Sequence, residues 1–337
     1  MPTVRSTDTM HAVYASMVRC YSAQAMRAPV LLYACFGVDA ARWSHELKCA
    51  LPELELRLWP DAGDLGEIDY VLAWHHPPGF LKQFPNLRAI FSMGAGVDRL
   101  LLDAELPRHI PLVRMADPGL AVLMKEYVLL RVLHYHRDMP AYKQQQRQAL
   151  WRQLPPLETR QRRVGVMGVG QIGGTCARAL AELGFEVRGW ARSLRDVPGV
   201  SVFAGPDRLR EFLSGVQILI CLLPLTADTR GILNAELFAQ LARGAWLINL
   251  ARGAHLVEAD LLRALDSGQL SGATLDVFTT EPLPREHPFW LDPRITITPH
   301  AAALTRPETA VPRLALNIAR ERAGQPLLDV VDLAAGY

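Results

Sequence analysis

Cysteine is scarce in this chain of 337 residues, and its distribution excludes one class of fold. The five cysteines are odd in number, form no C-x-x-C pair and lie far apart, at positions 20, 35, 49, 176 and 221. A disulfide-stabilised scaffold is therefore not expected. The pattern indicates reduced, mostly buried thiols and a cytoplasmic protein.

Long hydrophobic runs and an excess of charge are also missing. No apolar run reaches the roughly 18 residues that a membrane span needs, so no membrane partner is expected. The 36 basic and 34 acidic residues leave a formal charge of +2, which gives no reason to expect nucleic acid as a partner. The polar segment 1–28 lacks a continuous hydrophobic segment, so no secretory signal is expected. We expect a disordered extension or a start codon assigned too early, with an organellar leader as the open alternative.

What the chain does contain is an alternation of short apolar runs and helical stretches from residue 30 onward, which predicts an α/β fold with doubly wound parallel sheets. The length favours two domains. The first set of expected strands is 30–37, 55–60, 70–74, 88–94 and 110–115. The second set is 163–170, 185–190, 216–223, 245–250, 272–278 and 294–299. Apolar residues near helical spacing predict one long helix over 119–150 between them.

A glycine-rich turn follows the first strand of the second set. The stretch VGVMGVGQIGG holds Gly168-x-Gly170-x-x-Gly173 directly after a strand and at the start of a helix. The first glycine permits a tight turn, the second lets the backbone approach a pyrophosphate, and the third packs the helix on the sheet. This context predicts dinucleotide binding; the alternative is a turn whose glycines serve packing alone.

The acid that usually ends the next strand of such a fold is absent. In NAD-binding proteins that acid accepts hydrogen bonds from the adenosine ribose. Here Ala191 occupies its place, and Glu186 lies too early inside the strand. The residues that follow are cationic or polar: Arg192, Ser193 and Arg195. Such a loop suits a 2′-phosphate and predicts NADPH, with NADH still possible, unless these arginines are only solvated surface charge.

Ionisable residues follow three later strands, at the edge where doubly wound sheets bind ligands. Arg252 lies in NLARG, Asp276 and Glu281 in LDVFTTEPLP, and His300 in TPHAA. Taken singly, each has an ordinary structural explanation, such as an ion pair or a loop position. Taken together with the glycine turn, these motifs resemble those of the D-2-hydroxyacid dehydrogenase family.

The resemblance extends from residue 30 to the end of the chain. Further stretches, namely FSMGAGVD, AWHHPP, ARS, QALW and the terminal GY, are similar to the glyoxylate/hydroxypyruvate reductase A branch, which prefers NADPH. The resemblance implies a flavodoxin-like substrate domain at 29–118 plus 301–337. It implies a Rossmann NAD(P)-binding domain at 119–300.

The chemistry that the resemblance implies is reduction of a small 2-oxo acid, either glyoxylate to glycolate or hydroxypyruvate to D-glycerate. A hydride would reach the carbonyl carbon while His300, as an imidazolium, gives its oxygen a proton. Glu281 would favour the charged ring and fix its orientation. Arg252 would pair with the substrate carboxylate and polarise the carbonyl.

The resemblance also implies a set of cofactor contacts, in which Asp276 would bind the nicotinamide carboxamide. The full set is Gly168, Gly170, Gln171, Ile172, Gly173, Arg192, Ser193, Arg195, Pro224 and Asp276. No metal is expected, because the adjacent His75 and His76 have no acidic or cysteine partners at ligand spacing.

The first domain would bind the other half of the substrate. Gly94 and Gly96 in SMGAGVD lie at a strand end, where bare amides can approach a carboxylate. By resemblance, the amides of Ala95, Gly96 and Val97 do so. Trp74, at another strand end, is similar to a wall of the substrate pocket; ordinary packing is the alternative.

The helix at 119–150 resembles the dimerisation helix of the family, and Trp151 the residue that reaches towards the partner's active site. A homodimer is therefore expected. Two alternatives stay open for the activity. One is a nucleotide-sensing co-repressor of the same fold, against which the set of Arg252, Glu281 and His300 argues. The other is a dehydrogenase for a different short 2-hydroxy acid.

Overall fold

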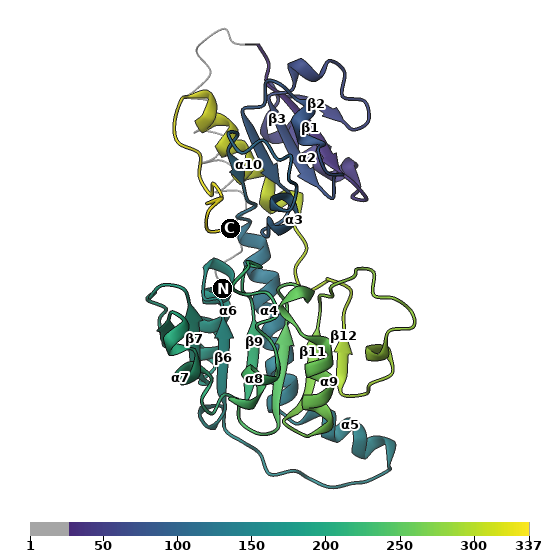
Figure 1. The fold of residues 1–337 in the computed structure, drawn as a ribbon, viewed down its shortest axis with the longest axis vertical. Helices are drawn as coiled ribbons and strands as arrows, with labels where there is room; N and C mark the ends of the chain where they lie inside the picture. Colours follow the sequence, from purple (N-terminus) through teal and green to yellow (C-terminus); the bar gives the residue numbers. More distant parts are fainter. Residues whose placement is uncertain (1–26, 337) are drawn as a thin grey trace, which may run out of the picture. The chain divides into compact units, whose positions relative to one another are not determined.

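The computed structural model describes residues 27–336, which fold into two compact units that we describe separately (Figure 1). One unit consists of the described residues up to Gly119 together with those from Thr305 onward, and the other is Leu120–Leu304. The extension expected at 1–28 lies almost wholly outside the described residues, and so does Tyr337 of the terminal Gly-Tyr pair.

The first unit contains a five-stranded parallel sheet in the order β2-β1-β3-β4-β5. Its strands are β1 (Val30–Cys35), β2 (Glu55–Leu58), β3 (Tyr70–Trp74), β4 (Ala89–Ser92) and β5 (Leu112–Val113). This order is that of flavodoxin-like folds, in which the strand order reverses direction between the first and third strands. The expected five strands and the flavodoxin-like topology are thus confirmed for this unit.

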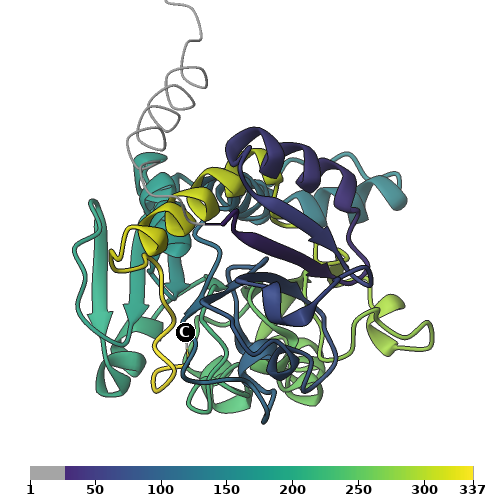
Figure 2. The ribbon, with the colours of Figure 1, turned by 90° about the horizontal axis from the view of Figure 1, so that it is seen from above.

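Successive residues of β1 contact two different cores, as the two-residue period of a strand requires. Leu31 packs in one core with the helices α2 (Ala40–Ala50) and α10 (Pro307–Arg322). Leu32 packs on the opposite face, against the short helices η2 (Leu81–Gln83) and α3 (Asp98–Leu101). The helices α2 and α10 lie side by side, so the C-terminal part of the chain completes the core begun by the N-terminal part (Figures 1 and 2).

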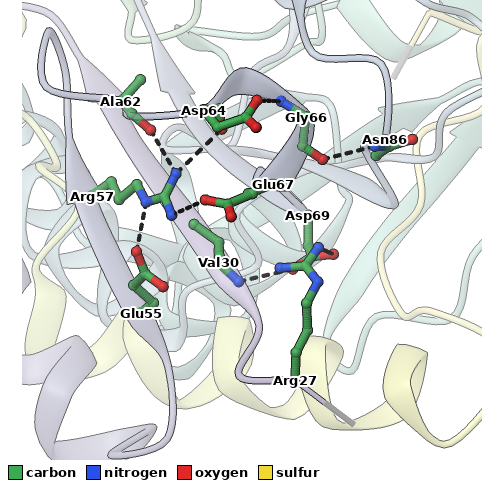
Figure 3. A network of polar contacts seen from close by, with 10 residues as sticks. All are labelled: Arg27, Val30, Glu55, Arg57, Ala62, Asp64, Gly66, Glu67, Asp69 and Asn86. Atoms are coloured by element: carbon green, nitrogen blue, oxygen red, sulfur yellow. Dashed lines mark hydrogen bonds and ion pairs between the residues drawn. The ribbon is translucent and has the colours of Figure 1, made fainter.

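Polar contacts fix the start of this sheet. The carboxylate of Asp69 is buried just before β3; it accepts from the Arg27 guanidinium at 2.8 Å and from the Val30 amide at 2.9 Å (Figure 3). Nearby, Arg57 pairs with Glu55 and Glu67, and it also donates to the backbone of the following loop (Figure 3). The contacts of Asp69 and of Arg57 thus stabilise the fold of this unit.

The second unit contains a seven-stranded parallel sheet in the order β12-β11-β10-β9-β6-β7-β8. Its strands are β6 (Arg163–Met167), β7 (Glu186–Ala191), β8 (Val200–Ala204), β9 (Ile218–Cys221), β10 (Ala245–Asn249), β11 (Leu270–Leu275) and β12 (Ile295–Ile297). Counted from β6, this is the Rossmann order with one further strand beside the sixth. The Rossmann class is confirmed, but β8 was missed because its short, partly exposed stretch VSVFA follows a loop of polar residues.

Helices cover both faces of this sheet (Figure 1). One face packs against α7 (Leu209–Leu213), α8 (Ala235–Ala239) and α9 (Glu258–Asp266). The other packs against α4 (Pro118–His136) and α6 (Gln171–Glu182). Both faces are therefore removed from water, and the loops at the strand ends are left to carry polar chemistry.

The single helix expected over 119–150 is wrong in one respect, because the chain breaks it into α4 and α5 (Met139–Arg147). Pro140 has no amide hydrogen for the carbonyl of His136, so the helix ends there and a new one begins with the proline in its first turn. Asp138 at the junction is left-handed, with φ of 53°. Although α4 is largely apolar, no helix among residues 27–336 is long and apolar enough to cross a membrane.

Candidate active site

The glycine turn between β6 and α6 has the geometry that its spacing predicts. Gly168 is left-handed, with φ of +94°, and a Cβ there would lie 2.6 Å from the carbonyl oxygen of Leu222. A Cβ at Gly173 would lie 1.9 Å from the carbonyl oxygen of Gly168. A side chain at Gly168 would collide with the backbone after β9, and one at Gly173 would push α6 away from the turn, so both glycines are required by the turn itself.

Gly170 differs, because a Cβ placed there meets nothing within 4 Å. It is the N-cap of α6 and offers no side-chain acceptor to the first amides of the helix. Those amides and the positive end of the helix dipole thus face open space, which fits the pyrophosphate of a dinucleotide. Gln171 and Ile172 form the first turn beside it.

The end of β7 carries no acid. Ala191 is buried there, and the following Arg192, Ser193 and Arg195 are exposed. Glu186, at the opposite end of the strand, is bound by the guanidinium of Arg163. Arg195 forms no ion pair within the part of the chain that the structure describes. The loop therefore presents positive charge where an adenosine ribose would lie in a Rossmann domain.

His300 and Glu281 form a hydrogen-bonded pair after β12 and β11, with 2.9 Å between His300 Nδ1 and a Glu281 carboxylate oxygen. The other Glu281 oxygen accepts from the Phe278 amide at 2.9 Å. Burial raises the pKa of Glu281, but the hydrogen bonds from His300 and Phe278 and the charges of His300 and Arg252 outweigh it, so the net pKa is lowered. The carboxylate stays ionised beside the ring, with its orientation fixed by two donors.

Asp276 supports the turn that carries His300, a role that its sequence position did not indicate. Its carboxylate is 1% exposed and accepts from the Thr298 hydroxyl and from the amides of Ala301 and Ala302 at 2.9 and 3.0 Å. The His300 amide donates to the Asp276 carbonyl at 2.8 Å. His300 itself is left-handed, with φ of 52°, so these bonds hold a residue in an unfavourable backbone conformation.

The loop of Arg252 is held by two buried polar side chains that the sequence analysis missed. Asn249, at the end of β10, donates to the Arg252 carbonyl and accepts from the Ala251 amide. His255 contacts the Arg252 amide. A Cβ at Gly253 would lie 1.9 Å from the carbonyl carbon of Phe278, so the loop of Arg252 packs directly on the segment that leads to Glu281.

The second unit thus brings Arg252, Glu281 and His300 to one edge of its sheet. Arg252 is close enough to lower the pKa of Glu281, and Glu281 binds His300. Asn249 and His255 gave only a weak signal in the sequence, because each is a single polar residue beside an apolar run. Within residues 27–336, no group of three or more His, Cys, Asp or Glu residues could hold a metal ion.

In the first unit, the two expected substrate elements lie against each other. A Cβ at Gly94 would lie 2.5 Å from the Trp74 ring, so the indole covers the backbone of the SMGAGVD loop. The Ser92 hydroxyl donates to the Gly94 carbonyl at 3.0 Å and fixes the turn. Among the described residues, the amides of Ala95, Gly96 and Val97 have no acceptor, which leaves them available to an anion.

Gly173 and Gly170 should serve different ends, the first folding and the second ligand binding. Substituting each by alanine tests this. Gly173→Ala should lower the free energy of unfolding by about 2 kcal/mol or more, because its Cβ overlaps the Gly168 carbonyl. Gly170→Ala should change it by no more than about 0.5 kcal/mol. It should nevertheless weaken dinucleotide binding, as measured by fluorescence titration. Equal unfolding midpoints in urea for the two variants would contradict this assignment.

Comparisons with known proteins agree with this geometry. The profile of the D-isomer specific 2-hydroxyacid dehydrogenase NAD-binding domain matches residues 129–302. Glyoxylate/hydroxypyruvate reductase A of Serratia proteamaculans is 48% identical over 304 residues, which cover 89% of this chain and 97% of that protein. The protein of the same name from Yersinia enterocolitica is 46% identical over 305 residues, with the same coverage.

Solved structures agree as well. A D-isomer specific 2-hydroxyacid dehydrogenase from Xanthobacter autotrophicus, in complex with NADPH and MES, is 41% identical, has a TM-score of 0.89, and covers 92% of this chain and 100% of its own. An NADPH-dependent glyoxylate/hydroxypyruvate reductase from Sinorhizobium meliloti, in complex with NADP and sulfate, is 40% identical, has a TM-score of 0.87 and the same coverage. The chain belongs to the D-isomer specific 2-hydroxyacid dehydrogenase family, in the branch of the glyoxylate/hydroxypyruvate reductases A.

Proposed function

We propose that this protein reduces a small 2-oxo acid with NADPH, turning glyoxylate into glycolate and hydroxypyruvate into D-glycerate. The observation that carries the proposal is the His300–Glu281 pair beside Arg252, at the ligand-binding edge of a Rossmann sheet. The names of the relatives and the NADP or NADPH in two similar structures support it.

The geometry assigns the proton transfer to one atom. Because His300 Nδ1 is bound to Glu281, Nε2 is the ring nitrogen available to the substrate. The ionised Glu281 stabilises the imidazolium and keeps Nε2 in place while it gives its proton to the carbonyl oxygen. When bound, the reduced nicotinamide supplies the hydride. Arg252 would bind the carboxylate and draw charge from the carbonyl.

The remaining substrate contacts are proposed for the first unit. The amides of Ala95, Gly96 and Val97 would bind an anionic oxygen of the acid. The Trp74 ring, which covers Gly94, would disfavour long substituents on the 2-carbon. A two- or three-carbon acid satisfies both conditions, since it offers one carboxylate and little bulk.

NADPH is proposed over NADH because of the loop after β7. Arg192, Ser193 and Arg195 can bind a 2′-phosphate, whereas Ala191 gives the ribose hydroxyls of NADH no acceptor. Asp276 is proposed to bind the nicotinamide carboxamide, since its carboxylate accepts from three donors and can accept a further hydrogen bond. Pro224 is proposed as a further cofactor contact.

A homodimer is proposed through α4 and α5. These helices and the residues after them expose large apolar side chains: Val122, Leu130, Leu133, Met139, Tyr142, Leu150 and Trp151. Trp151 is 98% exposed, which is unusual for an indole and fits a residue that contacts a second subunit.

A cytoplasmic location is part of the same proposal. The four described cysteines are free, and three of them are buried. Burial raises the pKa of Cys176 and that of Cys221 to about 12, so these thiols remain protonated and unreactive.

His300→Ala should lower kcat by a factor of about 100 or more, because the proton donor is lost, while the Kd for NADPH stays unchanged. His287→Ala is the matched control: His287 also pairs with a carboxylate, that of Glu258 at 3.1 Å, but neither residue belongs to the Arg252–Glu281–His300 set. Steady-state kinetics and fluorescence titration measure both effects. Wild-type turnover in His300→Ala would remove His300 as the acid.

Cofactor choice tests the cationic loop. The wild type should prefer NADPH over NADH by more than about tenfold in kcat/KM, equivalent to about 1.4 kcal/mol. The double variant Arg192→Ala/Arg195→Ala should lose most of that preference through a higher KM for NADPH. Arg178→Ala, at an exposed arginine on α6, should leave the preference unchanged. A preference that survives in the double variant would show that the loop does not bind the 2′-phosphate.

The dimer is tested by placing charge on the apolar surface of α4. Leu130→Glu should convert the dimer to a monomer in sedimentation velocity, because a carboxylate cannot be buried there unpaired. Leu102→Glu changes a still more exposed leucine in the first unit and should leave the dimer intact. A monomeric wild type, or dissociation by both variants, would count against this interface.

A further inference from the structure

His255 is a fully buried histidine next to the Arg252 loop, with no exposed surface in the described chain. It ends the short helix η5 (Gly253–His255), which follows β10 and Arg252 directly. Its ring therefore cannot touch a substrate. Any part that it has in the reaction must pass through the groups to which its two ring nitrogens bond.

The hydrogen-bond partners determine where the ring carries its proton. Nε2 lies 3.3 Å from the Pro224 carbonyl oxygen, which can only accept, so Nε2 carries a hydrogen. Burial disfavours a second proton and a charge, which leaves Nδ1 as an acceptor. The Arg252 amide, 3.2 Å from Nδ1, is the donor that it faces.

The alternative for Nδ1 is donation to the Arg252 carbonyl, also at 3.2 Å. That oxygen already accepts from the Asn249 side chain at 3.1 Å and from the His255 amide at 3.2 Å. Donation would add a third hydrogen to that oxygen, and Nδ1 would no longer accept from the Arg252 amide. The neutral ring with its proton on Nε2 satisfies both the Arg252 amide and the Pro224 carbonyl.

His255 thus joins two loops at the ligand-binding edge of the sheet. One loop follows β10 and carries Arg252; the other follows β9 and begins at Pro224. The Pro224 loop is closed on itself by Thr229, whose hydroxyl donates to the Pro224 carbonyl at 2.7 Å. The bond to this closed loop keeps the ring hydrogen on Nε2, so that Nδ1 accepts from the Arg252 amide.

We propose that His255 is a positioning residue, whose neutral ring accepts from the Arg252 amide at Nδ1 and so holds that backbone where the guanidinium meets the substrate carboxylate in one geometry. The inference rests on the proposed function, in which Arg252 binds that carboxylate. It assigns to the Nδ1 bond, rather than to the volume of the ring, the control of affinity for the 2-oxo acid.

Two substitutions with amide side chains each keep one of the two hydrogen bonds that the ring makes. In His255→Asn, the amide oxygen falls near the position of Nδ1 and can still accept from the Arg252 amide, but nothing reaches Pro224. In His255→Gln, the amide nitrogen falls near the position of Nε2 and can still donate to Pro224, but the acceptor for Arg252 is lost. His255→Leu keeps an apolar volume and loses both bonds.

The measurements are kcat and KM for glyoxylate at saturating NADPH, with the Kd of NADPH and the melting temperature as readouts of folding. His255→Gln and His255→Leu should raise the KM for glyoxylate about three- to tenfold, the range expected for one lost hydrogen bond, with a smaller change in kcat. His255→Asn should keep the wild-type KM within about twofold, which would be rescue by the retained acceptor. All three should bind NADPH.

Other outcomes overturn the inference. Equal losses in all three variants, in step with their melting temperatures, would make His255 a packing residue only. A wild-type KM in His255→Gln would show that the Nδ1 bond is not used. If the wild-type protein itself reduced neither glyoxylate nor hydroxypyruvate, the proposed function would fail first, and this inference with it.

Discussion

The turn that presents His300 depends on one buried carboxylate, that of Asp276. A carboxylate removed from water costs several kcal/mol unless donors replace the water, and three donors from the 298–302 turn do so here. The turn also needs this carboxylate, because His300 within the turn has a left-handed backbone conformation. Thr298 also bonds the Tyr127 hydroxyl at 2.6 Å, so this arrangement is tied to α4.

The loops after β10 and β11 are joined by close backbone contact rather than by long side chains. Gly253 lets the Arg252 loop meet the backbone of Phe278, and the Phe278 amide fixes Glu281, which orients His300. A shift in any of these loops is passed on to the next. The polar groups at this edge therefore act as one constellation, held near a single geometry before any ligand arrives.

The sequence was sufficient for the α/β class, through the alternation of apolar runs, and for the family, through ordered motifs at strand ends. The resemblance implied both kinds of sheet, although β8 of the second was missed. The sequence also placed Arg252, Glu281 and His300 in the same region. It did not reveal His255, whose partner Pro224 is distant along the chain, because the burial of one histidine is set by packing that no local pattern records. The break at Pro140 was readable but was outweighed by the apolar spacing of α4. The roles of the individual site residues stay predictions.

The second unit is one continuous piece of chain, whereas the first is made from both ends. During synthesis, Leu120–Leu304 can therefore complete its sheet while the first unit still lacks α10. Until α10 emerges, Trp43 and Leu47 of α2 lack part of the apolar surface that covers them in the finished protein. The first unit is thus complete only after the second, so a chain truncated near its end should lose the first fold before the second.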